Sequence, residues 1–348
     1  MAGKYASQGK LPSEAQLVKR FHASRPTIAR ALRTLDEEQL IERRVGSGTF
    51  IRELSDQRVS EEMKEVALLI PDLGEKEIFQ VIWGELATVA RTHGYSVMWG
   101  APAKPKRERE EMIADGEELC EQFIQRRVSG VFFAPSHKLG DANVRFAEML
   151  RKAGIPVVLL DKDLGSFPAH SDFDVASIDN VTAGHVMAEH LWNLGCRTFV
   201  FVTQADPASS VRARIAGVRE SLNGHDRYPD ARLTRFGDTS DIGFVKPLVS
   251  DLPDVLMCGN DETAATLLQT LAQLGVRVPR DVRVTGFDDV NVAHLVTPPL
   301  TTMQQPSREI AQIAFGAMLE RQSNAGLPVR HLSIAPRLII RQSCGTYG

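Results

Sequence analysis

The sequence predicts an α/β protein with an N-terminal winged helix-turn-helix and a larger two-lobed body built on parallel sheets. Three observations support this prediction. Residues 11–53 read as two short helices followed by a glycine-containing hairpin. From Val66 onward, short apolar runs alternate with amphipathic helical segments. The predicted strand ends in this second part have carboxylate and amide side chains, and ligands of open parallel sheets bind at such ends.

The first 53 residues have the pattern of a unit that places one helix in a DNA groove. The second helix is predicted to begin at Ser24, whose hydroxyl is suited to cap a helix N-terminus. Arg25 and Thr27 then lie in the first turn, and Arg30 and Arg33 lie on the polar face. Three apolar residues recur at helical spacing on the opposite face: Ile28, Leu32 and Leu35.

Charge is divided unevenly along the chain. Residues 1–53 contain ten Lys or Arg and six Asp or Glu, a net charge of +4, which leaves −7 for the remainder of a chain whose total is −3. A basic head on an acidic body fits a protein in which one domain faces phosphates. Arg43 and Arg44 precede the hairpin glycines, which allow the backbone to approach a phosphate closely.

Composition and motifs exclude several other classes of protein. No apolar run reaches the ~18 residues of a membrane span, and the four cysteines lack metal or disulfide spacing. No P-loop, dinucleotide-binding glycine motif or HExxH motif is present, and residues 185–190 have the wrong spacing for an inverted zinc motif. We therefore expect a cytoplasmic protein that is not an enzyme and that needs no cofactor, metal or membrane.

The body shows the alternation of apolar strands and helices that is typical of a sheet covered on both faces. The first helical segment places Phe79 on its apolar face. Two α/β units of this kind make two lobes. The predicted strands are residues 66–70, 95–99, 128–135, 155–161, 174–179, 197–203, 254–260 and 282–289.

Polar residues stand at the ends of several of these strands. Asp161, Asn180 and Asn260 follow three of them, Asp288 follows a fourth, and Arg214 lies early on a helix. Carboxylate, amide and guanidinium groups together suit a ligand rich in hydroxyls, because sugars both donate and accept hydrogen bonds. Asp and Asn in such positions also serve as turn formers and helix caps, and this alternative remains open for each one.

The head has four motifs in a specific order within residues 10–53: LPSE, SRPTIARAL, LIERR and GSGTF. They resemble the N-terminal domain of the GntR family of bacterial transcription factors, which implies a dimeric repressor that reads a palindromic operator. Ala15 and Ala29 stand where that family often has Arg, so other arginines would compensate. The predicted DNA-binding residues are Ser24, Arg25, Thr27, Arg30, Arg33, Arg44, Gly46 and Ser47.

The head departs from that family at its start. GntR-type domains usually have a helix before LPSE that ends in a pattern such as I-x-x-G-x-Y, but here the matching GKY stands at residues 3–5. Residues 1–10 are too few to form this helix, which would pack on Leu17 and Ile28. We expect either that Met1 is internal to a longer chain or that the head is truncated.

The body has its own ordered motifs: DNVTAGHVMAEHL, the R-x-x-G of Arg214–Gly217, CGND, VTGFDD and PPLTTMQQP. They resemble the LacI-type effector domain, which is similar to periplasmic sugar-binding proteins. Over roughly residues 64–348 the resemblance implies two lobes, a ligand in the cleft between them and a dimer. Thr239 stands where the family often stacks a Trp on the sugar, which leaves the ligand open. The predicted ligand-binding residues are Phe79, Asp161, Asn180, Arg214, Asn260 and Asp288.

A GntR-type head on a LacI-type body resembles the plan of the arabinose-responsive, AraR-type repressors, although this plan does not identify the ligand. We predict a DNA-binding domain at 1–53, a linker at 54–64 and an effector-binding and dimerisation domain at 65–348. Lobe 1 would comprise about 65–178 and 297–330, and lobe 2 about 179–296 and 331–348.

The predicted function is that of a ligand-responsive transcriptional regulator. As a homodimeric repressor it would bind palindromic operator DNA and respond to a small sugar or sugar derivative in the cleft, which would release the DNA. The alternative is a cytoplasmic sugar-binding protein with a degenerate head that no longer binds DNA.

Overall fold

The chain folds into two compact units, residues 1–63 and 64–348, which we call the head and the body. Our computed structural model describes residues 11–21, 23–37, 41–44, 48–51, 64–71, 77–100, 108–165, 170–227 and 233–346. Within these ranges, no helix has both the length and the apolar character that a membrane span requires.

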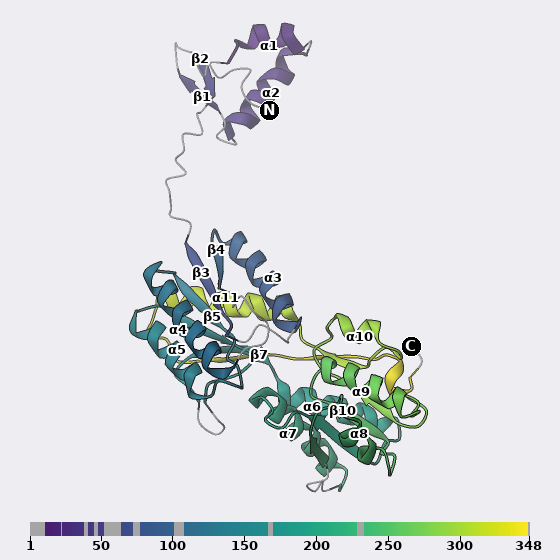
Figure 1. Ribbon diagram of the computed structural model, residues 1–348. Coiled ribbons are helices and arrows are strands. Elements are labelled where there is room, and N and C mark those ends of the chain that lie inside the picture. Colours follow the sequence, from purple (N-terminus) through teal and green to yellow (C-terminus); the bar gives the residue numbers. More distant parts are fainter. Residues whose placement is uncertain are drawn as a thin grey trace. The chain divides into compact units, whose positions relative to one another are not determined.

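The head has the predicted helix-turn-helix followed by a two-stranded wing (Figure 1). Its helices are α1 (Glu14–Phe21) and α2 (Arg25–Glu37). Strands β1 (Ile41–Arg44) and β2 (Gly48–Ile51) pair antiparallel, with Ile41 opposite Ile51. The wing tip at 45–47 lies outside the described residues, and the predicted DNA contacts Gly46 and Ser47 lie there with it.

A helix cap and a small core explain the local fold of the head. The Ser24 hydroxyl oxygen accepts a hydrogen bond from the backbone N–H of Thr27 at 3.4 Å, so Ser24 caps α2 as predicted. Leu35 is partly buried against the core. The two helices and the first strand bury a single apolar cluster: Leu17, Ile28, Leu32 and Ile41.

Lobe 1 of the body is a parallel sheet with helices on both faces. The strand order is β13-β7-β6-β5-β3-β4, and all neighbours run parallel. Helices α3 and α11 cover one face, and α4 and α5 cover the other (Figure 1). In chain order the first elements are β3 (Glu65–Leu69), α3 (Glu77–Thr92), β4 (Ser96–Gly100), α4 (Arg109–Gln125), β5 (Gly130–Phe133), α5 (Asp141–Lys152), β6 (Val157–Leu160) and β7 (Asp174–Ile178).

Lobe 2 repeats this architecture with a smaller parallel sheet in the order β11-β10-β8-β9. Strand β10 is buried throughout, as the continuous apolar run within residues 254–260 predicted. The elements of lobe 2 are α6 (Asn180–Asn193), β8 (Phe199–Thr203), α7 (Ser209–Gly224), β9 (Thr234–Phe236), α8 (Ile242–Leu248), β10 (Val255–Cys258), α9 (Asp261–Gln273), β11 (Arg283–Thr285) and α10 (Asn291–Leu295).

The C-terminal part crosses between the lobes, and here the predicted boundaries need correction. Residues 297–301 stay with lobe 2, because Leu300 is buried in its core and Thr301 bridges Thr285. Residues 331–334 belong to lobe 1, because β13 extends its sheet by pairing with β7. The elements are β12 (Thr302–Gln304), α11 (Ser307–Ser323), β13 (His331–Ile334), β14 (Arg337–Ile339) and the short helix η2 (Gln342–Cys344).

Two glycines set the closest helix contact of lobe 2. A Cβ atom on Gly217 would lie 1.9 Å from the carbonyl oxygen of Val181, and one on Gly184 would lie 1.9 Å from that of Arg214. Helices α6 and α7 can therefore approach backbone to backbone only with glycine at both positions. This contact places Arg214 beside Asn180 at the start of α6.

Candidate ligand cleft and nucleic-acid interface

Arg214 is the centre of a buried hydrogen-bond network at the carboxyl end of the lobe 2 sheet. Its side chain is 3% exposed. Nε donates to Asn180 Oδ1 at 2.9 Å, Nη1 to the carbonyl oxygen of Gly259 at 2.7 Å, and Nη2 to Asp288 Oδ1 at 3.3 Å. The guanidinium lies 4.3 Å from the ring centroid of Phe287, a cation–π contact. The structure thus brings together three predicted residues that are far apart in sequence.

Asp288 and Asn260 are fixed by further contacts. Asp288 adopts a positive φ of 105° and accepts a hydrogen bond from Gln305 Nε2 at 2.7 Å. Such a backbone conformation is sparsely populated outside glycine and is often found at functional sites. Asn260 caps α9, because its Oδ1 accepts from the N–H of Thr263 at 2.8 Å. The cap and the ligand-binding interpretations of Asn260 are therefore compatible.

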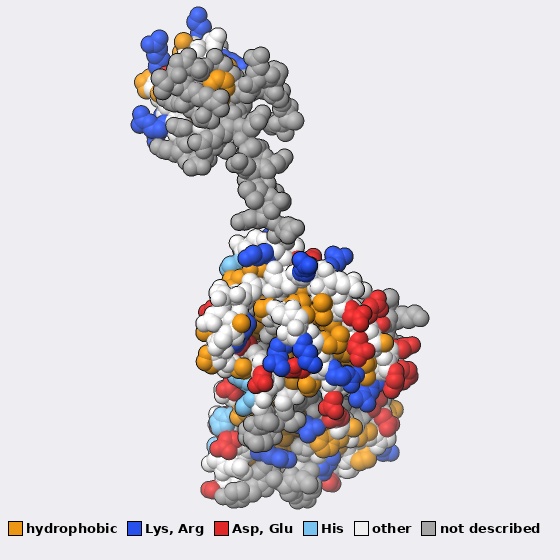
Figure 2. Space-filling view, turned by 90° about the vertical axis from the view of Figure 1, so that its left-hand side faces the viewer, with side chains coloured by type: hydrophobic (Ala, Val, Ile, Leu, Met, Phe, Trp, Pro, Cys, Tyr) orange, Lys and Arg blue, Asp and Glu red, His pale blue; other side chains and the backbone are white. Residues whose placement is uncertain are grey.

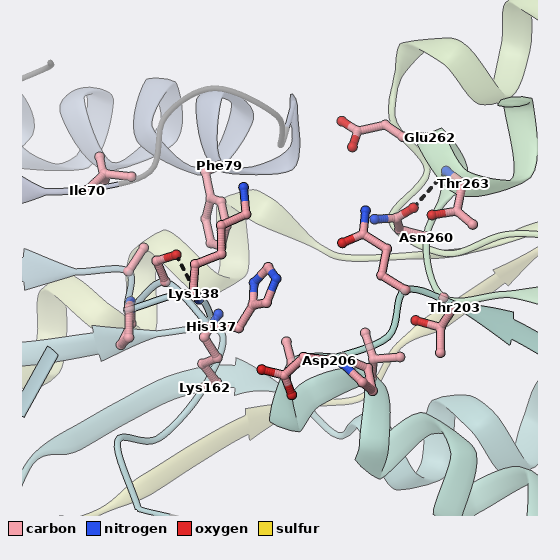
Figure 3. A pocket seen from close by; sticks show the side chains of 18 residues that line it. Ile70, Phe79, His137, Lys138, Lys162, Thr203, Asp206, Asn260, Glu262 and Thr263 are labelled. Atoms are coloured by element: carbon pink, nitrogen blue, oxygen red, sulfur yellow. Dashed lines mark hydrogen bonds between the residues drawn. The ribbon is translucent and has the colours of Figure 1, made fainter. Parts of the chain in front are cut away.

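A cavity lies between the lobes next to this network. Its volume is about 70 Å³, which is smaller than the roughly 300–1,000 Å³ of typical small-molecule sites. Phe79 and Asn260, two of the predicted ligand residues, line it from opposite lobes (Figure 3). Gly259 also lines the cavity, so the Arg214 network supports its wall directly.

The remaining predicted residues stand behind this wall. Asn180, Arg214 and Asp288 bond to one another rather than line the cavity. Asp161 follows β6 with a positive φ of 71° and accepts a hydrogen bond from Ser210 of lobe 2 at 3.2 Å. Direct contact of these four residues with a ligand stays a prediction.

Sequence reasoning missed several polar residues of the cavity. Lobe 1 contributes His137, Lys138 and Lys162, which face Asp206 and Glu262 of lobe 2 (Figure 3). His137 and Lys138 follow β5, and Lys162 follows β6, so they stand at the strand ends where ligands were expected. A search of these ends for cations as well as for carboxylates and amides could have found them.

The two lobes also bond directly to each other beside the cavity. The Glu77 N–H, at the start of α3, donates to Glu262 Oε1 at 3.3 Å. The Glu77 carboxylate in turn accepts from the N–H of Asn291 at 3.2 Å. Together with the bond from Ser210 to Asp161, these contacts link the lobes at two places around the cavity.

A buried carboxyl group lies under the cavity at the start of α9. Asp261 is fully buried, and burial together with the nearby carboxylate of Asp288 raises its pKa well above the usual value. Its oxygens accept from Thr302 Oγ1 at 2.6 Å and from the N–H of Val290 at 3.1 Å. Asp261 therefore ties the crossing strand β12 to lobe 2 just below Asn260.

The head presents its polar helix face to solvent. Ser24, Arg25, Thr27, Arg30 and Arg33 are all exposed, whereas the apolar stripe of α2 faces the core. Figure 2 shows Lys and Arg side chains that project from the described part of the head. The predicted Arg44 is the last residue of β1 and leads into the wing tip. These features suit a surface that binds phosphates and base edges, but contact with DNA stays a prediction.

Both units of the chain match known protein families. Residues 1–51 match the gntR family of bacterial regulatory proteins. Residues 188–344 match the periplasmic binding protein-like domain. The second match spans most of lobe 2 and the crossing segments, where the Arg214 network lies.

Individual relatives agree with these matches. An arabinose metabolism transcriptional repressor of Halalkalibacterium halodurans is 25% identical over 364 residues, which cover 99% of this chain and 92% of that protein. The ribose operon repressor of Escherichia coli K12 is 27% identical over 236 residues, or 64% of this chain and 67% of that protein. A solved structure is also similar: the transcriptional regulator CelR in complex with cellobiose, with a TM-score of 0.68 at 21% identity. The match covers 96% of this chain and 100% of that one, and it supports the fold.

The fold and both family matches support the class predicted from sequence for this chain, a transcriptional regulator. More particularly, it joins a GntR-type helix-turn-helix head to a LacI-type, periplasmic-binding-protein-like body.

Proposed function

We propose that this regulator represses transcription as a homodimer on a palindromic operator, and that a small sugar or sugar derivative in the cleft releases it. The observation that carries this proposal is the cavity between the lobes, where amide, carboxylate, ammonium and hydroxyl groups face the ring of Phe79. Hydroxyl-rich ligands need both donors and acceptors together with an apolar surface for the sugar ring. Relatives named for arabinose and ribose metabolism support the same ligand class.

The exposed face of α2 supports DNA binding by the head. In this proposal the recognition helix enters the major groove with Arg25 and Thr27 in its first turn, and the wing follows the phosphates. Arginine can bind guanine O6 and N7 with two parallel hydrogen bonds, so Arg25 would read bases, whereas Arg30 and Arg33 would contact the backbone or neighbouring bases.

Exposed apolar residues of lobe 1 support the dimer. Trp99 on β4 is 55% exposed and Val81 on α3 is 45% exposed. Trp99 also packs on Trp83, with ring centroids 5.5 Å apart. Large apolar side chains that are exposed to solvent are often found in interfaces. Two copies joined by a two-fold axis would match the symmetry of a palindrome.

The cleft supplies a mechanism for control. A ligand that binds one lobe arrangement more tightly shifts the population toward it, and this changes the operator affinity of the dimer. Couplings of this kind are about 1–3 kcal/mol, which corresponds to roughly 5–150-fold in affinity.

The test uses the full chain and fluorescently labelled DNA from the region upstream of its own gene. Anisotropy titrations at several salt concentrations should show tight binding that weakens steeply with salt. L-arabinose, D-ribose, cellobiose and other sugars are then screened by thermal shift, and any that raises the melting temperature is added to the DNA titration. At least one sugar should weaken DNA binding by 5-fold or more. A sugar that binds tightly without changing the DNA affinity would disprove the coupling, and absence of specific DNA binding would favour the degenerate head.

A further inference from the structure

We propose that Asp163, His170 and His331 form a binding site for a divalent transition-metal ion, with Zn²⁺ as its representative. The three residues lie on lobe 1. Asp163 is in the loop after β6, His170 precedes β7, and His331 begins β13. Each residue offers one ligand atom, and these atoms all lie within 4.8 Å of one another. Two imidazoles and one carboxylate are a common donor set for zinc and neighbouring metals.

The spacing of the ligand atoms allows coordination of one ion as well as a long hydrogen bond between His170 and Asp163. His170 Nδ1 lies 3.3 Å from Asp163 Oδ2, and His331 Nε2 lies 3.4 Å from the same oxygen. Good N–H···O hydrogen bonds are shorter, about 2.7–3.2 Å. Two ligands that each lie about 2.1 Å from a tetrahedral zinc ion are about 3.4 Å apart. Both distances to Asp163 therefore match an edge of a coordination tetrahedron.

The two imidazoles are arranged so that both can face one ion. Their ring centroids lie 4.5 Å apart with an interplanar angle of 78°. The rings therefore meet edge to face, and a nitrogen of each ring lies near the same carboxylate oxygen. Rings stacked face to face would instead direct their nitrogen lone pairs in parallel, so that the two lone pairs could not converge on one ion.

The rest of the Asp163 carboxylate is held by groups that would not touch the ion. Its Oδ1 accepts hydrogen bonds from the Ser171 hydroxyl and from the N–H groups of Gly165 and Ser171, the latter two at 3.2 Å. The Ser171 N–H also lies 3.2 Å from Oδ2, the oxygen that faces the two histidines.

The site is accessible to solvent ions. The Asp163 side chain is 13% exposed, whereas His331 is 38% and His170 61% exposed. Water could complete the coordination, as in open zinc sites. The site was not predicted from sequence, because the histidines are far apart in the chain and only the pairing of β13 with β7 brings His331 to this loop.

Its position suggests a link to the cleft. Asp163 is two residues from Asp161, which bonds to Ser210 of lobe 2, and one from Lys162, which lines the cavity. A metal ion would tie this loop to the edge strand β13. The site itself is argued from its own geometry and does not depend on the identity of the effector.

The experiment measures zinc binding to the full chain after dialysis against a chelator. Zn²⁺ is titrated in competition with a chromogenic chelator, and Co²⁺ is then used to obtain a visible absorption spectrum. The wild type should bind one Zn²⁺ per chain. His170→Ala, His331→Ala and Asp163→Asn should each weaken binding by at least 10-fold. Ser171→Ala, which removes only a support of Asp163, should weaken it by about 10–100-fold.

His225→Gln is the matched control. His225 Nε2 lies 2.9 Å from Glu189 Oε1 in lobe 2. Among the described residues, this His–carboxylate pair has no second histidine close enough to complete a group of three metal ligands. This variant should bind Zn²⁺ like the wild type. His170 is too exposed for its loss to unfold the protein, and equal melting temperatures in chelator would confirm this. The proposal is wrong if the wild type fails to compete for Zn²⁺, or if His170→Ala and His331→Ala bind as tightly as the wild type.

Discussion

Two buried charges organise the body, one in each lobe, and they differ in where they lie. Asp174 of lobe 1 is fully buried and accepts hydrogen bonds from Arg321 and Arg330, as close as 2.8 Å. Arg214 of lobe 2 is buried to a similar degree and donates to three acceptors. Asp174 begins a strand, whereas Arg214 bonds to Gly259, just past a strand end.

The comparison teaches that a buried ion network is not by itself a functional site. In both networks a buried charged side chain is stabilised by hydrogen bonds and by an oppositely charged partner. Only Arg214 supports the wall of a cavity, because ligands of parallel sheets bind at the carboxyl ends of strands. Variants in the two networks should therefore share a loss of stability and differ in their effect on the ligand.

The largest effect is expected from Gly217→Ala. The added Cβ would lie 1.9 Å from the Val181 carbonyl oxygen, so α6 and α7 must separate and Arg214 must leave its partners. We expect a loss of more than about 3 kcal/mol in the free energy of unfolding, measured by urea denaturation. Gly224→Ala on the same helix is the control, because nothing lies within 4 Å of its added Cβ. Equal stability of the two variants would refute the close contact.

Asp174→Asn should cost about 2–4 kcal/mol in stability, because it leaves two arginines facing a neutral group. Arg321 and Arg330 are 14% and 28% exposed, so solvent reduces the loss. The folded fraction should still bind the effector with the affinity of the wild type, as isothermal titration would show. A large loss of effector affinity would remove the distinction between the two networks.

The same network predicts a pH dependence. Burial raises the pKa of Asp174, but the hydrogen bonds from Arg330 and Arg321 outweigh this and lower it below its usual value. The resulting stability is present above the unfolded pKa of about 3.9 and is lost as the pH falls through the lower folded value. The stability difference between the wild type and Asp174→Asn should be constant from pH 7 to about pH 5 and shrink below about pH 4. A difference that grows on acidification would contradict this assignment.

Arg214→Lys tests the lobe 2 network. A lysine has one compact charge and cannot reach Asn180, the Gly259 carbonyl and Asp288 at once. We expect a loss of about 2 kcal/mol in stability and at least 10-fold weaker effector binding by the folded protein. DNA binding without effector should stay unchanged. Wild-type effector affinity in this variant would show that the network is structural only.

The smallest effects are expected when one peripheral partner is removed from each of the two networks. Gln305 donates to Asp288 at 2.7 Å, and Arg330 is the more exposed partner of Asp174. Gln305→Ala and Arg330→Ala should each cost about 1 kcal/mol, but only Gln305→Ala should alter the effector response of DNA binding. Anisotropy titrations with and without effector measure this, and equal responses would argue against a role of β12 in coupling.

The sequence predicted the local elements of the body well, because apolar strands and amphipathic helices leave clear patterns. Strands such as residues 66–70 and 254–260 correspond to β3 and β10 within a residue or two. The short exposed strand β13 was missed, because its residues alternate in exposure over only four positions. Its pairing with β7 joins segments far apart in the chain, which periodicity alone cannot show.

The candidate site was predictable only in part. Motif order pointed to Arg214, Asn260 and Asp288, and the structure brings the first and last of these together. The lysines and the histidine of the lobe 1 wall follow strands, but no motif singled them out. Which strand-end residues point into the cavity depends on loop conformation, and the positive φ of Asp161 is a property that spacing does not reveal.

The bonds that join Glu77 to Glu262 and Asn291, with the bond from Ser210 to Asp161, hold the two lobes together beside the cavity. We expect an effector to enter when these bonds are broken, so the rate of capture would depend on how often the lobes part. At high effector concentration the observed association rate should level off at that opening rate. These bonds would then limit how quickly the regulator responds, independently of how tightly it finally binds its effector.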